Sequence, residues 1–295
     1  MPAASGPVSC RVKVVDASQK YTLRCALRFS GLQIGFVKEL FAAVAGVTVR
    51  CATAQSANQN MKITKYAQST FSITNVKGKT LLIDPGKYNF TGTFTPAAFG
   101  QVHILVITHK HEDHFDRAAV KELTDLFQPV VLTNSEIADW LSQEGLSCRA
   151  GKVGDVVEVE GFKIELIKTD HVVRDESVLN FGLLIEADGC RVYHTSDTRL
   201  MEREVLPADR LSGVDALCVP IGNRGVVMGF DDALYFCDQF SPAMIIPMHY
   251  DSPKDKDRVR PGEFVERHRV LSRSLKQAAR ANVKVLGFGE SIQLP

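Results

Sequence analysis

Residues 109–114 have the sequence His-Lys-His-Glu-Asp-His, which places three imidazoles and an aspartate within six consecutive positions. Neutral imidazole and carboxylate groups are ligands for Zn, Mn, Fe or Ni. The whole chain has only eight histidines, so this concentration favours a metal-binding loop over the alternative, a solvated turn. The apolar residues at 104–108 directly precede the loop and predict a buried strand that would hold the ligands rigidly.

The bulk properties of the chain describe an ordinary globular protein. It has 295 residues, 45% of them hydrophobic and 23% charged, which is enough for a substantial core in one large or two small domains. The net charge of +1 gives no reason to expect nucleic acid or an anionic membrane as a partner. We find no apolar run near the roughly 18 residues that a membrane span needs.

The seven cysteines are odd in number, and no two form a Cys-x-x-Cys pair. This argues against a disulfide framework and against a cysteine-type zinc site, and it suits a reducing compartment. We therefore expect a cytoplasmic protein. Cys218 and Cys237 lie in apolar sequence and are predicted to be core residues.

Residues 1–60 differ from the rest of the chain, with seven basic residues against two acidic ones. They could be an organelle presequence, a secretory signal with its apolar run at 41–49, or an accessory element with a short helix near 36–45. The interpretation we favour is a mis-set start, with the true chain beginning at Met61. The protein would be sent to an organelle or secreted only if 1–60 is a targeting segment.

From Met61 the pattern predicts one α/β domain over residues 61–295. Short apolar stretches bounded by Gly, Pro, Asn or Asp predict strands at 69–75, 79–84, 103–108, 163–168, 180–186, 190–194, 215–219, 243–247 and 283–287. Helices are predicted at 117–127, 133–143, 231–240 and 263–281. Ser135 and either Asp231 or Asp232 are the predicted N-caps. In the first part of this domain several strands follow one another, and later strands alternate with helices. This order suggests a layered sheet sandwich covered by helices.

Four further predicted strands end in a carboxylate or an imidazole. Asp84, His171, Asp197 and His249 each follow an apolar stretch directly. Sites in α/β folds are usually built at the carboxyl ends of strands. Each residue alone is more often a turn or structural residue, but together with 109–114 they supply enough ligands for two metals that share a carboxylate.

In this order, His-x-His-x-Asp-His followed by a spaced His, Asp and His resembles the signature of metallo-β-lactamase-fold hydrolases. The segments 193–198, 219–222 and 246–250 resemble the branch related to the ascorbate-6-phosphate lactonase. The resemblance covers 61–295 and none of 1–60. It implies a four-layer αβ/βα metallo-β-lactamase-like sandwich and a metal-dependent hydrolase.

The resemblance also implies roles for individual residues. The residues implied for the first metal are His109, His111 and His171, those for the second are Asp113, His114 and His249, and the implied bridging carboxylate is Asp197. Asp84 resembles the acid that braces the His-rich loop. Two divalent ions are implied, with zinc first and Mn, Fe or Ni as alternatives. The sequence departs from the branch at Ser196, where Gly is usual, and at Val172-Val173 after His171.

Two metals about 3.5–4 Å apart lower the pKa of a shared water and so generate a hydroxide nucleophile. We expect hydrolysis of a lactone, ester or phosphoester small molecule, with Asp113 as general base if only one metal binds. Tyr250 is a candidate for oxyanion contact. Arg174, Asn223 and Arg224 are candidates for substrate binding.

Other interpretations keep the fold but change the function. One is a di-iron redox protein, which usually has acidic replacements in the His-rich loop and a flavin domain. Another is a non-catalytic metal-binding or sensor protein, and a nuclease would need a basic extension. His103, His194 and His268 are predicted to be structural. An oligomer is possible, although the amphipathic helix at 263–281 is predicted to cover the sheet instead of forming an interface.

Overall fold

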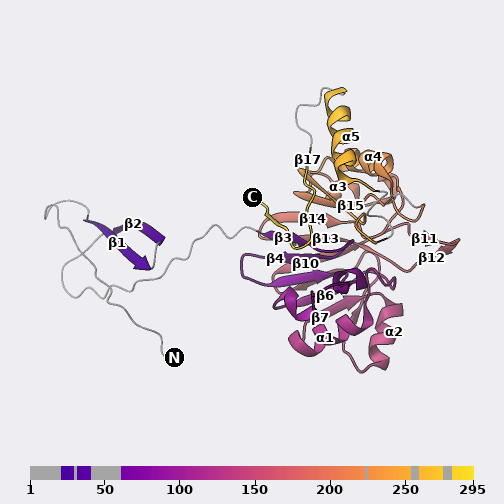
Figure 1. The fold of residues 1–295 in the computed structure, drawn as a ribbon, viewed down its shortest axis with the longest axis horizontal. Helices are drawn as coiled ribbons and strands as arrows, with labels where there is room; N and C mark the ends of the chain where they lie inside the picture. The colour runs from indigo at the N-terminus through magenta and orange to yellow at the C-terminus, as the bar shows by residue number, and fades with distance from the viewer. Residues whose placement is uncertain (1–20, 30–31, 41–60, 223–224, 254–258, 275–280) are drawn as a thin grey trace. The chain divides into compact units, whose positions relative to one another are not determined.

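The computed structural model describes residues 21–29, 32–40, 61–222, 225–253, 259–274 and 281–295 (Figure 1). Contacts divide the chain into two units, Met1–Ser56 and Ala57–Pro295. Within the described residues, no helix combines the length and apolar character that a membrane crossing requires.

In the first unit, β1 (Tyr21–Phe29) pairs antiparallel with β2 (Leu32–Leu40). The short helix predicted near 36–45 is therefore wrong for 36–40, and 41–45 lies outside the described residues. Strand β2 is rich in β-branched and aromatic residue types, which favour strands. Antiparallel pairing runs along the whole of β1 and provides backbone hydrogen bonds at alternate residue pairs.

The second unit contains a sheet that we call the N-terminal sheet, with strand order β18-β3-β4-β5-β6-β7-β8. Its strands are β3 (Lys62–Lys65), β4 (Phe71–Thr74), β5 (Thr80–Ile83), β6 (Ile104–Ile107), β7 (Val130–Thr133), β8 (Arg149–Ala150) and β18 (Ser291–Gln293). Pairing is antiparallel from β18 to β5 and parallel from β5 to β8.

The C-terminal sheet has strand order β17-β16-β15-β14-β13-β10-β9. Its strands are β9 (Val156–Val159), β10 (Phe162–Ile167), β13 (Gly182–Ala187), β14 (Cys190–His194), β15 (Ala216–Pro220), β16 (Met244–Met248) and β17 (Asn282–Val283). Pairing is antiparallel from β9 to β14 and parallel from β14 to β17. A separate hairpin joins β11 (Val172–Val173) to β12 (Glu176–Ser177).

Helices cover the outer face of each sheet, as Figure 1 shows. The α-helices are α1 (Arg117–Phe127) and α2 (Ser135–Gln143) on the N-terminal sheet, and α3 (Ala208–Leu211), α4 (Phe230–Phe240) and α5 (Pro261–Ser274) on the C-terminal sheet. The 3-10 turns are η1 (Lys87–Phe90), η2 (Pro96–Phe99) and η3 (Arg203–Val205). The order helix, sheet, sheet, helix is the predicted four-layer α/β sandwich.

Strand alternation explains how one sheet joins two cores. Ile104 and Val106 of β6 point into the core between the sheets. Leu105 and Ile107 pack instead under α1 and α2. Because both faces of β6 are buried, its sequence is continuously apolar without alternation, as is typical of parallel strands covered on both sides.

The structure corrects the predicted helix starts. Asn134, and not Ser135, caps α2, because its side chain accepts a hydrogen bond from Ile137 N at 3.1 Å. Helix α4 begins after Gly229, one residue before the predicted acids, so Asp231 and Asp232 lie in its first turn. There they still favour the helix through its dipole.

Several strand boundaries also differ from the prediction. Strand β7 occupies 130–133. No strand was predicted there, and a helix was predicted to begin at 133. The strand predicted at 283–287 is reduced to β17 at 282–283. The edge strands β8 and β9 were not predicted either. Strand β8 has only two residues, both exposed, and β9 is mostly apolar but only four residues long, with one residue buried.

Helix α5 is attached to the C-terminal sheet mainly through Phe264, which is fully buried and lies 5.9 Å from the ring of Phe230. Val270 and Leu271, near the end of the helix, are 55% and 41% exposed. The prediction that this helix covers the sheet therefore holds for its beginning only, and residues 275–280 lie outside the described chain.

Replacing Phe264 with alanine should remove this attachment. We expect Phe264→Ala to lower the free energy of unfolding by about 3–5 kcal/mol, the usual cost of deleting a buried aromatic side chain. Leu271→Ala on the same helix should cost less than about 1 kcal/mol, since its side chain already contacts water. Urea denaturation of both variants gives the comparison, and equal losses would contradict the role of Phe264.

Candidate metal centre

The carboxylates and imidazoles singled out in the sequence come together where strands of both sheets end. Asp84 follows β5 and residues 109–114 follow β6, both in the N-terminal sheet. His171, Asp197 and His249 lie after β10, β14 and β16 of the C-terminal sheet. The site therefore depends on how the two sheets pack against each other.

Residues at these strand ends turn the chain sharply. Asp84, Ser196 and His249 have φ angles of 48°, 55° and 57°, in the left-handed region. Residues other than glycine are uncommon there. Such conformations persist where the surrounding structure fixes them, often at functional sites. Here each of the three residues lies one or two positions beyond the end of a strand.

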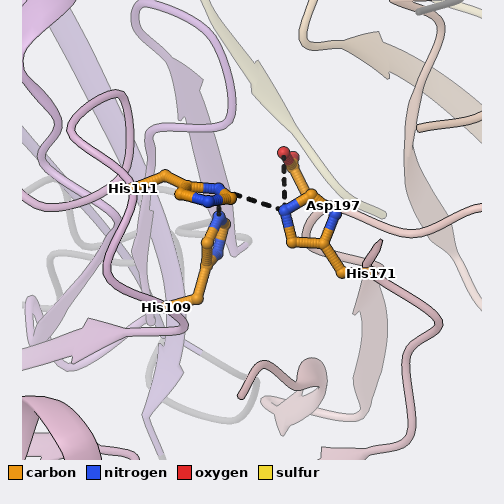
Figure 2. A group of neighbouring side chains, drawn as sticks. All are labelled: His109, His111, His171 and Asp197. Atoms are coloured by element: carbon orange, nitrogen blue, oxygen red, sulfur yellow. Dashed lines mark hydrogen bonds and ion pairs between the residues drawn. The ribbon is translucent and has the colours of Figure 1, made fainter. Parts of the chain in front are cut away.

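Three imidazole nitrogens converge in a first group (Figure 2). His111 Nδ1 lies 3.0 Å from His109 Nε2 and 3.1 Å from His171 Nε2. These separations are close to the ~3.3 Å edge expected for a tetrahedron of nitrogens about 2.0–2.1 Å from a zinc ion. Asp197 Oδ2 lies 3.9 Å from His171 Nε2 and completes the group.

The hydrogen bonds on the far side of these rings fix which nitrogen faces inward. His171 Nδ1 donates to Val226 O at 3.1 Å, and His109 Nδ1 lies 3.1 Å from Thr108 Oγ1. Both therefore direct an unprotonated Nε2 at the single Nδ1 of His111. One N–H cannot satisfy two lone pairs, so a cation at this point accounts for the arrangement.

The protonation of the first group also suits a metal. Burial lowers the pKa of His109 well below its ordinary value, and His114 adds to the effect. Burial likewise lowers the pKa of His111 and of His171. Neutral imidazoles with free lone pairs are the form that binds divalent metals.

A second group combines acids and imidazoles. His249 Nε2 lies 3.3 Å from Asp113 Oδ2 and 3.1 Å from Asp197 Oδ2, while His114 Nε2 lies 3.1 Å from Asp197 Oδ1. Asp113, His114 and His249 have ligand atoms close enough to share one ion. His114 Nε2 and Asp197 Oδ1 are buried and make no hydrogen bond to any other described group, so they fit a metal ligand set.

Opposite charges compensate one another in this second group. Burial acts to lower the pKa of His249, but the carboxylates of Asp197 and Asp113 outweigh it and raise the pKa to about 10. Asp197 and Asp84 raise the pKa of His114 in the same way against burial. A divalent cation would provide the positive charge that protons otherwise supply to these buried carboxylates.

Asp84 braces the His-rich loop from behind. Its carboxylate accepts hydrogen bonds from Thr108 N and Thr108 Oγ1, both at 2.7 Å, and from His114 Nδ1 at 2.7 Å. The proton on His114 is thereby held on Nδ1, which leaves Nε2 for the site. These contacts are of the kind expected of an acid that braces metal ligands, the role that the resemblance implies for Asp84, which stays a prediction.

The loop carrying His171 is held against the loop carrying Asp197. The guanidinium of Arg199 donates to both carboxylate oxygens of Asp170 at 3.0 Å, and Arg199 N donates to Asp170 O at 2.8 Å. Asp170 N in turn donates to Thr198 Oγ1 at 3.0 Å. We call Asp170 and Arg199 the ligand clamp, because each lies one or two residues from a proposed ligand.

The sequence candidates for substrate contact are less well supported. The hydroxyl of Tyr250 donates to Leu286 O at 3.1 Å, so the structure does not direct it at the ligands as predicted. Arg174 is exposed in the turn between β11 and β12. Asn223 and Arg224 lie outside the described residues.

The histidines predicted to be structural have backbone partners. His103 Nδ1 accepts from Thr80 N at 3.1 Å, and buried His194 donates from Nε2 to Ser69 O at 2.9 Å. His268 lies in α5. Sequence reasoning missed the ligand clamp, whose acid and base are 29 positions apart; Asp170 stands directly before a proposed ligand, which is the signal that was available.

A family model described as a beta-lactamase superfamily domain matches residues 62–249. The chain belongs to this superfamily. Two relatives named as metal-dependent hydrolases agree with the match. One, from Methanocaldococcus jannaschii, is 32% identical over 194 residues, which are 64% of this chain and 84% of the relative. The other, from Staphylococcus epidermidis, is 30% identical over 223 residues, covering 69% and 95%.

A solved structure supports the same assignment. Igni18, described as a metallo hydrolase from Ignicoccus hospitalis, has a TM-score of 0.66 and 27% identity, and the match covers 80% of this chain and 99% of Igni18. This superfamily member is thus a metal-dependent hydrolase by family. The family model matches from residue 62, within the second unit, and its range includes all the proposed ligands.

Gly86 gives a test of how tightly the ligand loop is held in this beta-lactamase superfamily member. A Cβ at this position would overlap the backbone carbonyl of Asp113 and come within 2.5 Å of His114 N. We expect Gly86→Ala to lower the free energy of unfolding by about 1–3 kcal/mol and to reduce the bound metal, measured by elemental analysis. Gly92→Ala is the control, because its added Cβ meets no atom within 4 Å, and equal metal content in both would contradict the argument.

The ligand clamp gives a second test. Arg199→Ala should weaken binding of one metal about tenfold, as loss of a supporting interaction behind a metal ligand commonly does. Stability should change by less than about 1 kcal/mol because the pair is half-exposed. Lys163→Ala, which breaks a similarly exposed pair with Glu186 on the same sheet, should leave affinity unchanged. Chelator competition measures the metal affinity of both variants. Equal affinities in Arg199→Ala and Lys163→Ala would exclude a role for the ligand clamp.

Proposed function

We propose that this metal-dependent hydrolase cleaves a lactone, ester or phosphoester in a small molecule at a two-metal centre. The observation that carries the proposal is the convergence of imidazole nitrogens and carboxylate oxygens from both sheets into adjacent, overlapping groups. Two ions in such groups, when bound, lower the pKa of a shared water and polarise the substrate oxygen.

The ligand assignments proposed from the sequence fit the two groups. His109, His111 and His171 would hold one ion, and Asp113, His114 and His249 the other, with Asp197 between them. The nitrogen-rich donor set favours zinc, although imidazole and carboxylate also suit Mn, Fe or Ni. Among the described residues no cysteine belongs to these groups, and the buried Cys218 and Cys237 lie in the apolar cores.

Asp113 has a further proposed role as general base if one ion alone is bound. Burial acts to raise the pKa of its carboxyl group, but the imidazoles of His249 and His114 outweigh it and lower the pKa. The group is therefore ionised at neutral pH, which suits a metal ligand. As a general base it would be weak, because a lowered pKa disfavours its protonation. Its side chain retains partial exposure, so an incoming water or substrate can reach it.

We propose the cytoplasm as the compartment of this hydrolase. The described cysteines Cys148, Cys190, Cys218 and Cys237 are all free, which suits a reducing environment. The near-neutral net charge of +1 supports a small molecule over nucleic acid as the substrate.

The metal centre is tested by removing one ligand from each group. We expect the purified protein to carry up to two ions per chain, and His111→Ala and His249→Ala each to lose one of them in elemental analysis. Chelation should abolish hydrolysis across a panel of lactones, carboxyl esters and phosphodiesters, and added Zn²⁺ should restore it, because the nucleophile depends on the metal.

The control for this experiment is His103→Ala, a histidine whose ring bonds only to the neighbouring strand. It should keep both its metal and its activity. Full metal content in both ligand variants would defeat the proposed centre. Bound metal without hydrolysis of any member of the panel would favour the alternative of a non-catalytic sensor.

A further inference from the structure

Gln68 lies in the turn between β3 and β4 and is 1% exposed. Its φ angle is 55°, a left-handed conformation that is uncommon for glutamine. This conformation belongs to a tight hairpin turn, in which Thr70 N donates to Ala67 O at 3.0 Å. The turn is also held by contacts with residues distant in the sequence. Those contacts lead to two of the proposed metal ligands.

Gln68 touches both Asp113 and His249. Its side-chain Nε2 donates to Asp113 Oδ2 at 3.4 Å, and its backbone carbonyl accepts from His249 N at 3.3 Å. The orientation of the amide is fixed from its other end, where Oε1 accepts from Asp251 N at 3.1 Å. The N–H groups of the amide are therefore on the side facing Asp113.

A buried ion pair stands behind Gln68. Lys65, which is fully buried, places Nζ 2.6 Å from Asp251 Oδ2 and 2.7 Å from Tyr66 O. The other oxygen of Asp251 accepts from Gln68 N at 2.7 Å. A fully buried lysine is rare and costly to desolvate unless it is paired, so this pair is a rigid, specific anchor for the turn.

We propose that Gln68 is a positioning residue for the second ligand group, and that the Lys65–Asp251 pair holds it in place. The amide restricts rotation of the Asp113 carboxylate, while the carbonyl fixes the backbone of His249. No contact joins Gln68 to His109, His111 or His171 among the described hydrogen bonds, so the effect should be confined to one ion. The inference rests on the proposed two-metal centre.

The test separates the affinities of the two ions. Gln68→Met keeps the length of the side chain and removes both amide hydrogen bonds. We expect its second-group affinity for Zn²⁺ to fall about 10- to 100-fold, the range for lost supporting contacts at metal sites, with first-group affinity changed less than about threefold. Stepwise chelator competition on the full chain gives both constants, and His111→Ala and His249→Ala identify which step belongs to which group.

Asn75→Leu is the matched control. Asn75 is similarly buried, and its amide holds the turn between β4 and β5 through Lys77 N, Lys79 N and Glu160 O. It should lower stability without altering either metal constant. This separates loss of a buried amide in general from loss of the contact with Asp113.

Asp251→Asn provides a second variant if Gln68→Met does not fold. It weakens the anchor while keeping an oxygen for Gln68 N, and we expect a smaller loss in the same second-group constant. Equal weakening of both constants, or no change in either variant, would overturn the positioning role. Failure of the unmodified protein to bind two ions would instead overturn the proposed two-metal function.

Discussion

The apolar core between the two sheets is the constraint on which the site depends. Each group of proposed ligands draws residues from both sheets, so their distances of about 3–4 Å exist only while the sheets keep one relative position. Side chains such as Phe71, Phe162 and Phe181 fill this core and are almost completely buried. Close packing resists sliding, because even small shifts open voids or create overlaps.

Hydrogen bonds at the edge of this core fix the relative position of the two sheets. Ser196 Oγ donates to Thr108 Oγ1 at 2.8 Å, and His194 donates to Ser69 O at 2.9 Å. Each joins a residue of one sheet's loops to a residue of the other's. Apolar packing alone has little directional preference, whereas buried hydrogen bonds penalise any register that leaves them unmade. Apolar packing therefore brings the two sheets together, and the buried hydrogen bonds between them select the one arrangement in which the ligands meet.

Sequence reasoning was most successful where local pattern and chemistry coincide. An apolar strand followed at once by imidazoles identified β6 and its loop, and helix α1 was predicted with its observed bounds of 117–127. The pattern could not show Gln68, because its partners Asp113 and Asp251 are 45 and 183 positions away. Tyr250 was predicted to contact an oxyanion because it stands next to His249. Its hydroxyl donates to Leu286 O, a partner 36 positions away that the local sequence could not indicate.

The two ligand groups are supported from different directions, which gives them separate energetic control. His171 is fixed by Val226 O and by the ligand clamp, both within loops of the C-terminal sheet. Asp113 and His249 are fixed by Gln68, which belongs to a turn of the N-terminal sheet. Asp197 contacts both groups and is the element they share. Because both groups contact Asp197, a change in the support of one group should be felt by the other mainly through this shared carboxylate.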